Sequence, residues 1–371
     1  MTTVSRVPRP VATESLTYSS VGVDTDDAEA GLERLIARIK TTWPDSGIGH
    51  VKLDVGFFAN VIDLGPVWLA ITTDGVGTKA LVAQMAGRYD TIGIDCVAMN
   101  VNDVICVGAR PISLVDYLAV QEAAPDLIEQ ISIGLVEGAR AAGVSITGGE
   151  IAQIPEMLVH AGSGVGFDLA ATAVGIVEPG KLIVGDDMEE GDVVFGVSSN
   201  GVHSNGLTLA RRALLGTGAF SPDEYVPELG ASVLEELLRP THIYVPEFDA
   251  LAARGVQAKA LIHVTSDGFL NLTRVTSDVG YVLDSLPEAP PIFQLIQHAG
   301  RVAVEEMYHV YNMGIGFCVV VSEKHAEVCA EALAACGRDV YRIGHVVDDA
   351  ERKVQIPALG LTGRDSRFTS D

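Results

Sequence analysis

The segment best suited to chemistry covers residues 72–79, with the sequence TTDGVGTK, directly after the apolar run VWLAI. Gly75 and Gly77 let the backbone turn tightly and present amide N–H groups to phosphate oxygens. Asp74 offers the hard oxygen ligands that Mg²⁺ prefers, and Lys79 can neutralise phosphate charge. The spacing is not that of a P-loop, which has four residues between its glycines. The alternative interpretation is an ordinary hairpin turn at a strand end.

Further polar residues interrupt the apolar run TIGIDCVAMNVNDVICVGA at residues 91–109. A carboxylate such as Asp95 is costly to bury unless it is paired, hydrogen-bonded or bound to a metal. Asn100 and Asp103 are three residues apart and share one face of the expected helix, where Asp103 can reach the same ion as Asp74. A helix cap or a buried hydrogen bond is the alternative for both Asp95 and Asp103.

The triplet Gly148-Gly149-Glu150 follows an expected short strand and places a carboxylate on what should be a tight turn. Glu150 is thus a third candidate metal ligand, although the triplet alone is weak evidence. Several carboxylates that converge on Mg²⁺ and phosphate would suit phosphoryl transfer, in which positioning and charge neutralisation provide most of the catalysis.

Two polar turns in the second half of the chain each contain a histidine. The first, SSNGVHSNG at residues 198–206, lies between an expected strand and an expected helix, so its backbone amides favour an anion. His203 in this turn can transfer a proton or only donate a hydrogen bond to substrate. His263, in the turn HVTSDG, has the same two interpretations. No Ser-His-Asp or Cys-His arrangement with supporting spacing is present.

Composition excludes several classes of protein. The 371 residues include 25 Lys+Arg and 49 Asp+Glu, a formal net charge of −24, with 48% hydrophobic and 20% charged residues. Such a chain can bury large cores and is not disordered, and its acidity argues against a nucleic-acid backbone as partner. Five scattered cysteines, no signal peptide and no run of ~18 apolar residues indicate a cytoplasmic protein without a membrane span. The acidity leaves open which groups would receive a small anionic substrate.

The elements that must position these residues alternate between helices and strands, which indicates an α/β or α+β fold. Residues 1–17 are expected to form a mobile arm, and the turn-rich stretch 178–192 divides a first domain (18–179) from a second (180–371). The expected helices cover residues 26–40, 91–107, 125–142, 205–215, 233–238, 270–275, 293–299 and 325–336. The expected strands cover residues 60–63, 67–73, 112–120, 144–146, 169–177, 193–197, 262–264, 315–321 and 340–345.

Taken in order, these segments resemble the aminoimidazole ribonucleotide synthetases, also called phosphoribosylformylglycinamidine cyclo-ligases. The resemblance is carried by TTDGVGTK, by DTIGIDCVAMNVNDVICVGARP at residues 90–111, by GGE with Pro155 and Met157, and by SSNGVHSNG. It is extended by YSSVGVDTD (18–26), RPTHIYV (239–245), HVTSDGF (263–269), MYHVYNMGIG (307–316) and YRIGHV (341–346), so that it covers residues 16–347.

The resemblance implies a two-domain α/β subunit whose N-terminal strands meet across a homodimer interface, and it implies ATP and Mg²⁺. The implied reaction is the ATP-dependent ring closure of formylglycinamidine ribonucleotide. By resemblance, Asp74, Asp103 and Glu150 are metal ligands, with Asp95 as a further one, and Asp74, Lys79 and His203 are catalytic. The implied nucleotide-binding and substrate-binding residues are Thr73, Gly75, Gly77, Thr78, Asn100, Gly148, Gly149, Ser204, Asn205 and His263.

The chain departs from the family pattern at two turns. The family has a long glycine-rich loop before TDGVGTK, whereas this chain has HVKLDVGFFAN at residues 50–60, where Asp54 is a compensating candidate metal ligand. Asp267 stands where the family has a glycine. Two alternatives remain: another ATP-dependent enzyme of the same superfamily, which includes thiamine-monophosphate kinase and selenophosphate synthetase, or a non-catalytic nucleotide-binding paralogue.

Overall fold

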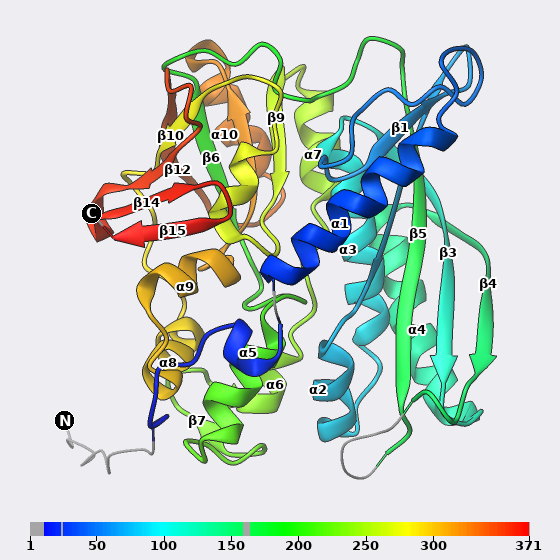
Figure 1. Ribbon diagram of the computed structural model, residues 1–371, viewed down its shortest axis with the longest axis vertical. Helices are drawn as coiled ribbons and strands as arrows, with labels where there is room; N and C mark the ends of the chain where they lie inside the picture. Colours follow the sequence, from blue (N-terminus) through cyan, green and yellow to red (C-terminus); the bar gives the residue numbers. More distant parts are fainter. Residues whose placement is uncertain (1–10, 24, 159–163, 371) are drawn as a thin grey trace.

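The computed structural model describes residues 11–23, 25–158 and 164–370, and it contains two α/β units that lie side by side (Figure 1). The first unit is built on a five-stranded sheet and the second on an eight-stranded sheet. The mixed α/β fold with two units that the sequence predicts is confirmed. No helix among the described residues is long and apolar enough to cross a membrane.

The first sheet has the strand order β1-β2-β5-β3-β4. Its strands are β1 (Asn60–Asp63), β2 (Trp68–Gly75), β3 (Arg110–Val120), β4 (Ser145–Gln153) and β5 (Phe167–Val177). All neighbours are antiparallel except β3 and β4, which are parallel and are joined by the crossover helix α4 (Pro125–Ala142). Helix α3 (Ile92–Cys106) packs against α4 and β5, so one face of this sheet is covered.

Helices α3 and α4 approach closely because glycines face each other at their crossing. A Cβ atom on Gly93 would lie 2.1 Å from the backbone N of Leu135, and one on Gly134 would lie 2.6 Å from the carbonyl oxygen of Asp90. The absence of side chains at these two positions therefore sets the depth of α3 against α4. This placement matters because α3 carries Asp95, Asn100, Asn102 and Asp103.

The second sheet has the order β15-β14-β13-β10-β12-β6-β11-β9. Its strands are β6 (Val193–Ser198), β9 (Ala258–His263), β10 (Gly280–Val282), β11 (Ile315–Val321), β12 (Val340–Val347), β13 (Val354–Ile356), β14 (Leu361–Arg364) and β15 (Arg367–Ser370), with a separate ribbon of β7 (Tyr225–Val226) and β8 (Ala231–Ser232). Every residue of β11 is buried, as expected for a central strand.

The remaining helices connect and cover the two sheets. They are α1 (Thr25–Ile39), α2 (Lys79–Ala86), α5 (Leu207–Arg211), α6 (Val233–Leu237), α7 (Val245–Ala253), α8 (Pro291–Gly300), α9 (Val304–Val310) and α10 (Ala326–Ala334). Helix α5 continues into the π-helical turn η3 (Arg212–Gly216). The 3-10 turns are η1 (Ser19–Val21), η2 (Lys40–Thr42), η4 (Gly268–Thr273), η5 (Glu323–His325) and η6 (Pro357–Leu359).

Most predicted elements are confirmed, including the hairpin β1–β2 and the helices α3 and α4. The predicted turn at Gly148-Gly149-Glu150 is wrong, because β4 runs through the triplet to Gln153. Pairing with β3 along eight residues of β4 explains why two glycines do not end the strand. The predicted α-helix at 270–275 is the 3-10 turn η4. Helices α2, α7 and α9 and strands β10 and β13–β15 were not predicted.

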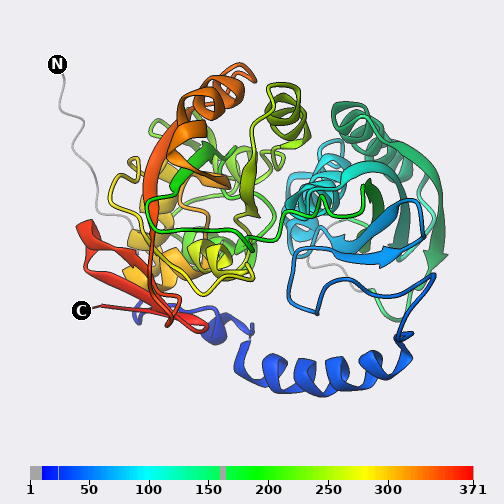
Figure 2. The same cartoon turned by 90° about the horizontal axis from the view of Figure 1, so that it is seen from above.

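The N-terminal segment is anchored to the second unit before it reaches the first. Residues 1–10 of the predicted arm lie outside the described residues. The backbone N–H groups of Ala12 and Leu16 donate to the carbonyl oxygens of Ala299 (2.8 Å) and Gly300 (3.0 Å) at the end of α8. Helix α1 then crosses from the second unit to the first (Figure 2). Residues 12–16 of the predicted arm are therefore held in place.

Candidate functional site

Asp74 lies near the end of β2, where the strand leads into the loop before α2. Its backbone N–H donates to Asn100 Oδ1 (3.0 Å), and Asn100 Nδ2 donates to the carbonyl oxygen of Asp74 (3.1 Å). A single side-chain amide from α3 thus fixes the strand end. Gly77 takes a left-handed conformation with φ 56°, and Thr78 is the last residue before α2. The tight turn that the glycines of TTDGVGTK predict is present.

Asp74, Asp103 and His263 come together where the first unit contacts the second. Asp103 Oδ1 on α3 lies 2.9 Å from Nδ1 of His263, the last residue of β9. His263 has no exposed surface, and Asn102 Nδ2 lies 3.4 Å from its Nε2. Because an amide nitrogen can only donate, this contact assigns the proton of the imidazole to Nδ1, which donates to Asp103.

The electrostatics of this cluster identify Asp74 as its most perturbed carboxyl. Burial, followed by the nearby charge of Asp103, raises the pKa of Asp74 to about 6, against smaller lowering effects of the Gly75 N–H and His263. Two carboxylates held close together in a partly desolvated place are poised to share a cation. Of the residues predicted from the sequence, Asp74, Asp103, His263 and Asn100 are the ones that lie in or against this cluster.

Lys79 and Asp95 lie apart from this cluster and are fully buried. Lys79 Nζ donates to Asp95 Oδ1 (2.7 Å) and to the carbonyl oxygen of Arg239 (2.6 Å). The same Oδ1 accepts hydrogen bonds from the N–H and the hydroxyl of Thr241, both at 2.7 Å, and from Ser204 Oγ at 3.1 Å. The structure thus places Lys79 in an internal ion pair with Asp95. This placement does not support the predicted contacts of Lys79 with phosphate and of Asp95 with a metal ion.

His203 is also enclosed by protein. Its backbone has φ 63°, its side chain is 2% exposed, and Nε2 accepts a hydrogen bond from the backbone N–H of Asn200 (3.0 Å). Burial, helped by the charges of His263 and Lys79, holds the pKa of His203 well below its usual 6.5, so the ring is neutral. A buried neutral ring that organises its own turn is a poor proton donor to substrate. The structure thus speaks against the predicted catalytic role of His203.

Ser204 and Asn205 organise the junction of the two units. Ser204 reaches Asp95 as described above, and Asn205 Oδ1 accepts from Ser266 Oγ (3.0 Å). The neighbouring Asp267 has φ 74° and is paired with Arg274 (2.9 Å) and His309 (3.6 Å). These cations, His309 foremost, lower the pKa of Asp267. The carboxylate that replaces a glycine of the family pattern is therefore ionised and compensated within the protein.

The predicted ligand Glu150 lies on the other face of the sheet from Asp74. In register across the sheet, Asp74 pairs with Ala171, Ala171 with Asp116, and Asp116 with Gly149. Residues directly opposite share a face, whereas successive residues alternate, so Glu150 faces away from Asp74 and Asp116. A Cβ atom on Gly149 would lie 2.4 Å from Asp116 Oδ1. Gly149 therefore makes room for Asp116.

Asp116 is a site candidate that the sequence prediction missed. It lies mid-strand in β3, shares a face with Asp74 two strands away, and has its pKa raised by burial. A carboxylate inside the apolar run ISLVDYLAV was the available signal. The last predicted ligand, Asp54, is exposed and paired with Lys40 at 2.5 Å. Within residues 11–23, 25–158 and 164–370, no group of three or more His, Cys, Asp or Glu side chains is arranged to hold a metal ion.

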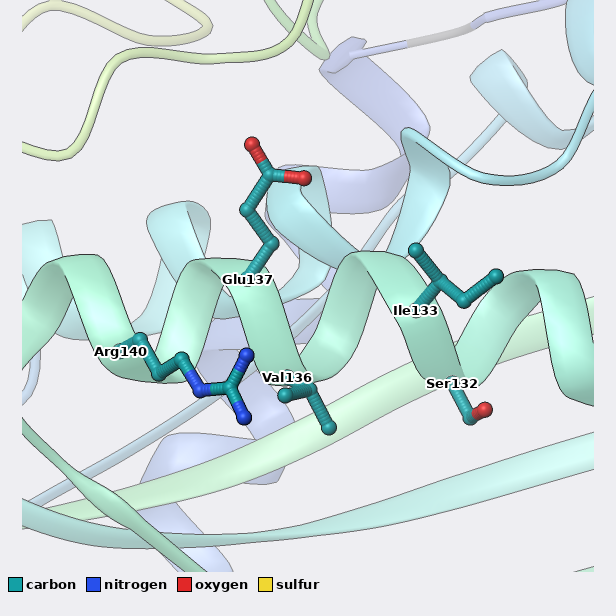
Figure 3. Close-up of a pocket in the computed structure, with 5 residues that line it drawn as sticks. All are labelled: Ser132, Ile133, Val136, Glu137 and Arg140. Atoms are coloured by element: carbon teal, nitrogen blue, oxygen red, sulfur yellow. The ribbon is translucent and has the colours of Figure 1, made fainter.

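Two cavities adjoin the TTDGVGTK segment. One of about 430 Å³ lies at the glycine-poor loop 50–60 and is lined by Trp43, Phe57 and Thr73, among others. Another of about 700 Å³ lies between the N-terminal segment, α2 and α5. A third hollow has a volume of about 480 Å³. Its described lining residues all come from one element, helix α4 (Figure 3).

Comparisons with known families match both units. The family described as "AIR synthase related protein, N-terminal domain" matches residues 58–177, and its C-terminal counterpart matches residues 189–357. The phosphoribosylformylglycinamidine cyclo-ligase of Methanobrevibacter smithii is 45% identical over 341 residues, 92% of this chain and 97% of that protein. The protein of the same name from Thermococcus kodakarensis is 44% identical over 344 residues, 92% and 98% of the two chains.

Solved structures show the same fold at lower identity. A thiamine-monophosphate kinase from Stenotrophomonas maltophilia has a TM-score of 0.58 and 22% identity, and covers 88% of this chain and 95% of its own. The structure titled "AaThiL complexed with AMPPCP and TMP" has a TM-score of 0.60 and 18% identity, with coverages of 91% and 96%. The fold, the matched family models and the full-length relatives agree: this chain belongs to the AIR synthase related family.

Proposed function

We propose that this protein catalyses the ATP-dependent ring closure of formylglycinamidine ribonucleotide to aminoimidazole ribonucleotide, with release of ADP and phosphate, in the cytoplasm. The observation that carries the proposal is the convergence of Asp74, Asp103 and His263 beside the TTDGVGTK loop. It occurs in a chain whose full-length relatives are named for that reaction. The alternative activities considered from the sequence have no comparable support.

The residues present fit a Mg²⁺ ion that accompanies ATP. The carboxyl group of Asp74 is partly desolvated and repelled by Asp103, which is why its pKa is raised. A divalent cation would relieve both effects. Mg²⁺ in phosphoryl-transfer sites is commonly held by one or two carboxylates together with substrate phosphates and water. Asp74 and Asp103 would hold it, and bound Mg²⁺ would neutralise phosphate charge.

The cavity at residues 50–60 suits the base of ATP. Rings of Trp43, Phe57 and Phe58 contribute to its lining, as do Thr72 and Thr73, which immediately precede Asp74. Nucleotide sites are mostly apolar pockets with a few polar groups that fix orientation. A base placed here would direct its phosphates along β2 toward Asp74. On this proposal the loop that has lost the glycines of the family pattern forms an apolar wall for the base.

The chemistry requires one phosphoryl transfer followed by ring closure. The γ-phosphoryl group of ATP moves to the formamide oxygen, and ADP leaves. The amidine nitrogen then attacks the activated carbon, phosphate departs, and loss of a proton completes the imidazole. Positioning dominates such catalysis. Asn100 fixes Asp74 through two hydrogen bonds, and Asp103 fixes the His263 ring in one tautomer.

We also propose a homodimer formed through the uncovered face of the first sheet. On the face opposite α3 and α4, the apolar side chains of Ile71, Val115, Tyr117 and Ile176 are 38–46% exposed. They come from the three adjacent strands β2, β5 and β3. An apolar surface that extends across several strands is typical of an interaction site. A second copy can cover this face symmetrically, as most soluble homo-oligomers do.

The decisive experiment measures ADP release and aminoimidazole ribonucleotide formation by the purified protein with formylglycinamidine ribonucleotide, ATP and Mg²⁺. The two products should form in equal amounts. Asp74→Asn and Asp103→Asn should each lower kcat/KM at least about 100-fold. Asp90→Asn, which changes an exposed aspartate paired with Arg88, is the matched control and should stay within twofold of the wild type. ADP release that ignores this ribonucleotide would contradict the proposal.

A further inference from the structure

The 700 Å³ cavity beside α5 is a pocket with an unusual concentration of positive charge. Its lining includes Ser20 of the N-terminal segment, Met85 of α2, and Thr208, Arg211 and Arg212 of α5 and η3. In Figure 1, α5 lies beneath the N-terminal segment and beside α2. Three separate parts of the chain therefore enclose one space. None of the described residues that line it is an aspartate or glutamate.

Arg211 and Arg212 have no counter-charge within the part of the chain that the structure describes. Several other arginines are paired with carboxylates, as Arg254 is with Glu331 and Arg342 with Glu323. Among the described residues, no carboxylate lies within 4.0 Å of the guanidinium group of Arg211 or Arg212. Nε of Arg211 is buried without a hydrogen-bond partner. In a chain with a net charge of −24, two adjacent arginines without partners in a cavity call for an anionic ligand.

Burial of the Arg211 guanidinium supports this reading. Burial of this group, which takes it partly out of water, lowers the pKa of Arg211. The geometry would satisfy an anion with several donors. Guanidinium groups bind phosphate through paired N–H donors, and the hydroxyl groups of Ser20 and Thr208 line the same space.

The pocket is connected to the TTDGVGTK segment by a direct hydrogen bond. Thr208 Oγ1 donates to Thr78 Oγ1 (3.0 Å), and Thr78 is four residues from Asp74 in the TTDGVGTK segment. Four residues of chain span at most about 14 Å. A ligand that extends from the pocket past Thr208 therefore comes to the TTDGVGTK segment, which carries Asp74. The proposed base cavity for ATP is lined by Thr72 and Thr73, at the opposite end of the TTDGVGTK segment from Thr78.

We propose that this pocket binds the terminal phosphate of the ribonucleotide substrate, with Arg211 and Arg212 as its principal partners. The inference rests on the proposed function for the identity of the ligand, and on the pocket itself for its chemical class, a phosphate monoester. The two substrates then approach the Asp74–Asp103 cluster from opposite sides of the TTDGVGTK segment. Side-chain cations, and not backbone amides alone, receive the substrate's charge.

The test compares the variants Arg211→Gln and Arg212→Gln with the wild type and with Arg342→Gln, which removes an exposed arginine outside the pocket. Steady-state kinetics should show KM for formylglycinamidine ribonucleotide raised about 10- to 100-fold in the pocket variants. KM for ATP should stay within twofold, and Arg342→Gln should match the wild type. An unchanged KM for the ribonucleotide in both pocket variants would overturn the inference. Arg212 is exposed, so its variant remains informative if Arg211→Gln does not fold.

A binding measurement separates this inference from the proposed function. Calorimetry with D-ribose 5-phosphate, against D-ribose as control, needs no turnover. The wild type should prefer the phosphorylated sugar, and Arg211→Gln and Arg212→Gln should weaken that preference at least 10-fold. If the wild type forms no aminoimidazole ribonucleotide but still shows this Arg211-dependent preference, the function is wrong and the pocket assignment stands. If it is active and shows no such preference, the pocket assignment is wrong.

Discussion

Lys79 and Asp95 form an ion pair in which neither side chain has any exposed surface, with Nζ and Oδ1 2.7 Å apart. The pair belongs to the first unit, but its other hydrogen-bond partners, Arg239, Thr241 and Ser204, all belong to the second. Burial alone lowers the pKa of Lys79, and the charge of Asp95 opposes that shift. Through these hydrogen bonds, the ion pair fixes α2 and α3 against the second unit.

Breaking this pair should destabilise the protein more than breaking an exposed one. Lys79→Met leaves a buried, uncompensated carboxylate and is expected to lower the free energy of unfolding by about 3–5 kcal/mol. The double variant Lys79→Met/Asp95→Asn removes both charges but keeps the acceptor for Thr241, and should recover most of the loss. Chemical denaturation measures both values.

The matched control for the ion pair is Arg342→Met, which breaks an exposed pair with Glu323. Exposed pairs contribute up to about 1 kcal/mol, so this variant should differ little from the wild type. A Lys79→Met protein as stable as Arg342→Met would show that the buried pair does not stabilise the contact between the two units.

Asp74 should make stability depend on pH in the direction opposite to a salt-bridged carboxyl. Its pKa in the folded protein is about 6, above the ordinary 3.8, so the folded state binds more protons between these values. Stability from this group therefore falls as pH rises from about 4 to about 6. Without Mg²⁺ and ATP, Asp74→Asn should be more stable than the wild type above pH 7, by on the order of 3 kcal/mol, and equal to it near pH 4.

Thermal or chemical unfolding of the wild type and Asp74→Asn across pH 4–8 checks this expectation. Asp90→Asn serves as the control, since Asp90 is exposed and paired with Arg88. Addition of Mg²⁺ with ATP should stabilise the wild type and leave Asp74→Asn nearly unaffected. An Asp74→Asn curve that runs parallel to the wild-type curve at all pH values would contradict the assigned environment of Asp74.

The close contact between α3 and α4 should not tolerate even one methyl group. In Gly93→Ala, the added Cβ would lie 2.1 Å from the backbone N of Leu135, so the helices must separate. We expect a loss of about 3 kcal/mol or more, at the upper end of overpacking costs. Gly31→Ala is the control: nothing lies within 4 Å of its Cβ, and alanine should stabilise α1 by up to about 1 kcal/mol. Equal effects of the two substitutions in denaturation would refute this account.

The proposed dimer can be tested on the uncovered face of the first sheet. Tyr117→Glu places a charge among apolar side chains of β2, β3 and β5, and should shift the protein from dimer to monomer in sedimentation velocity. Tyr225→Glu is a matched control, because Tyr225 is 64% exposed on the short ribbon of the second unit. A wild type that sediments as a monomer at micromolar concentration would rule out this interface.

The sequence predicted the elements whose patterns are locally strong. Helix α3 was recognisable as a mostly apolar run, and the crossover helix α4 by its periodicity and its position between two strands. Strand β4 was predicted too short because glycines discourage strands in isolation. Its parallel pairing with β3, a contact between distant residues, overrides that preference. The short strands β13–β15 lack enough residues to show a period.

The same distinction between local patterns and distant contacts explains which site residues could be predicted. Asp74, Asp103 and His263 were identifiable because polar residues within or next to apolar runs are costly to bury unless they are paired or bind a ligand. The burial of Lys79, Asp95 and His203 depends on how the two units pack, and no local pattern encodes that packing. Asp116 was overlooked because it sits mid-strand, and only the sheet register reveals that it shares a face with Asp74.

The anchoring of the N-terminal segment has a consequence for biosynthesis. Ala12 and Leu16 bond to Ala299 and Gly300, and the backbone N–H of Tyr18 donates to Glu306 (2.6 Å), 288 residues later in the chain. A ribosome must therefore add the 288 residues that separate Tyr18 from Glu306 before this contact can form. Ser20, which follows this segment, lines the arginine pocket. The wall of the pocket that contains Ser20 is therefore fixed only after Glu306 has been synthesised, so a nascent chain that ends before this residue carries no finished binding site.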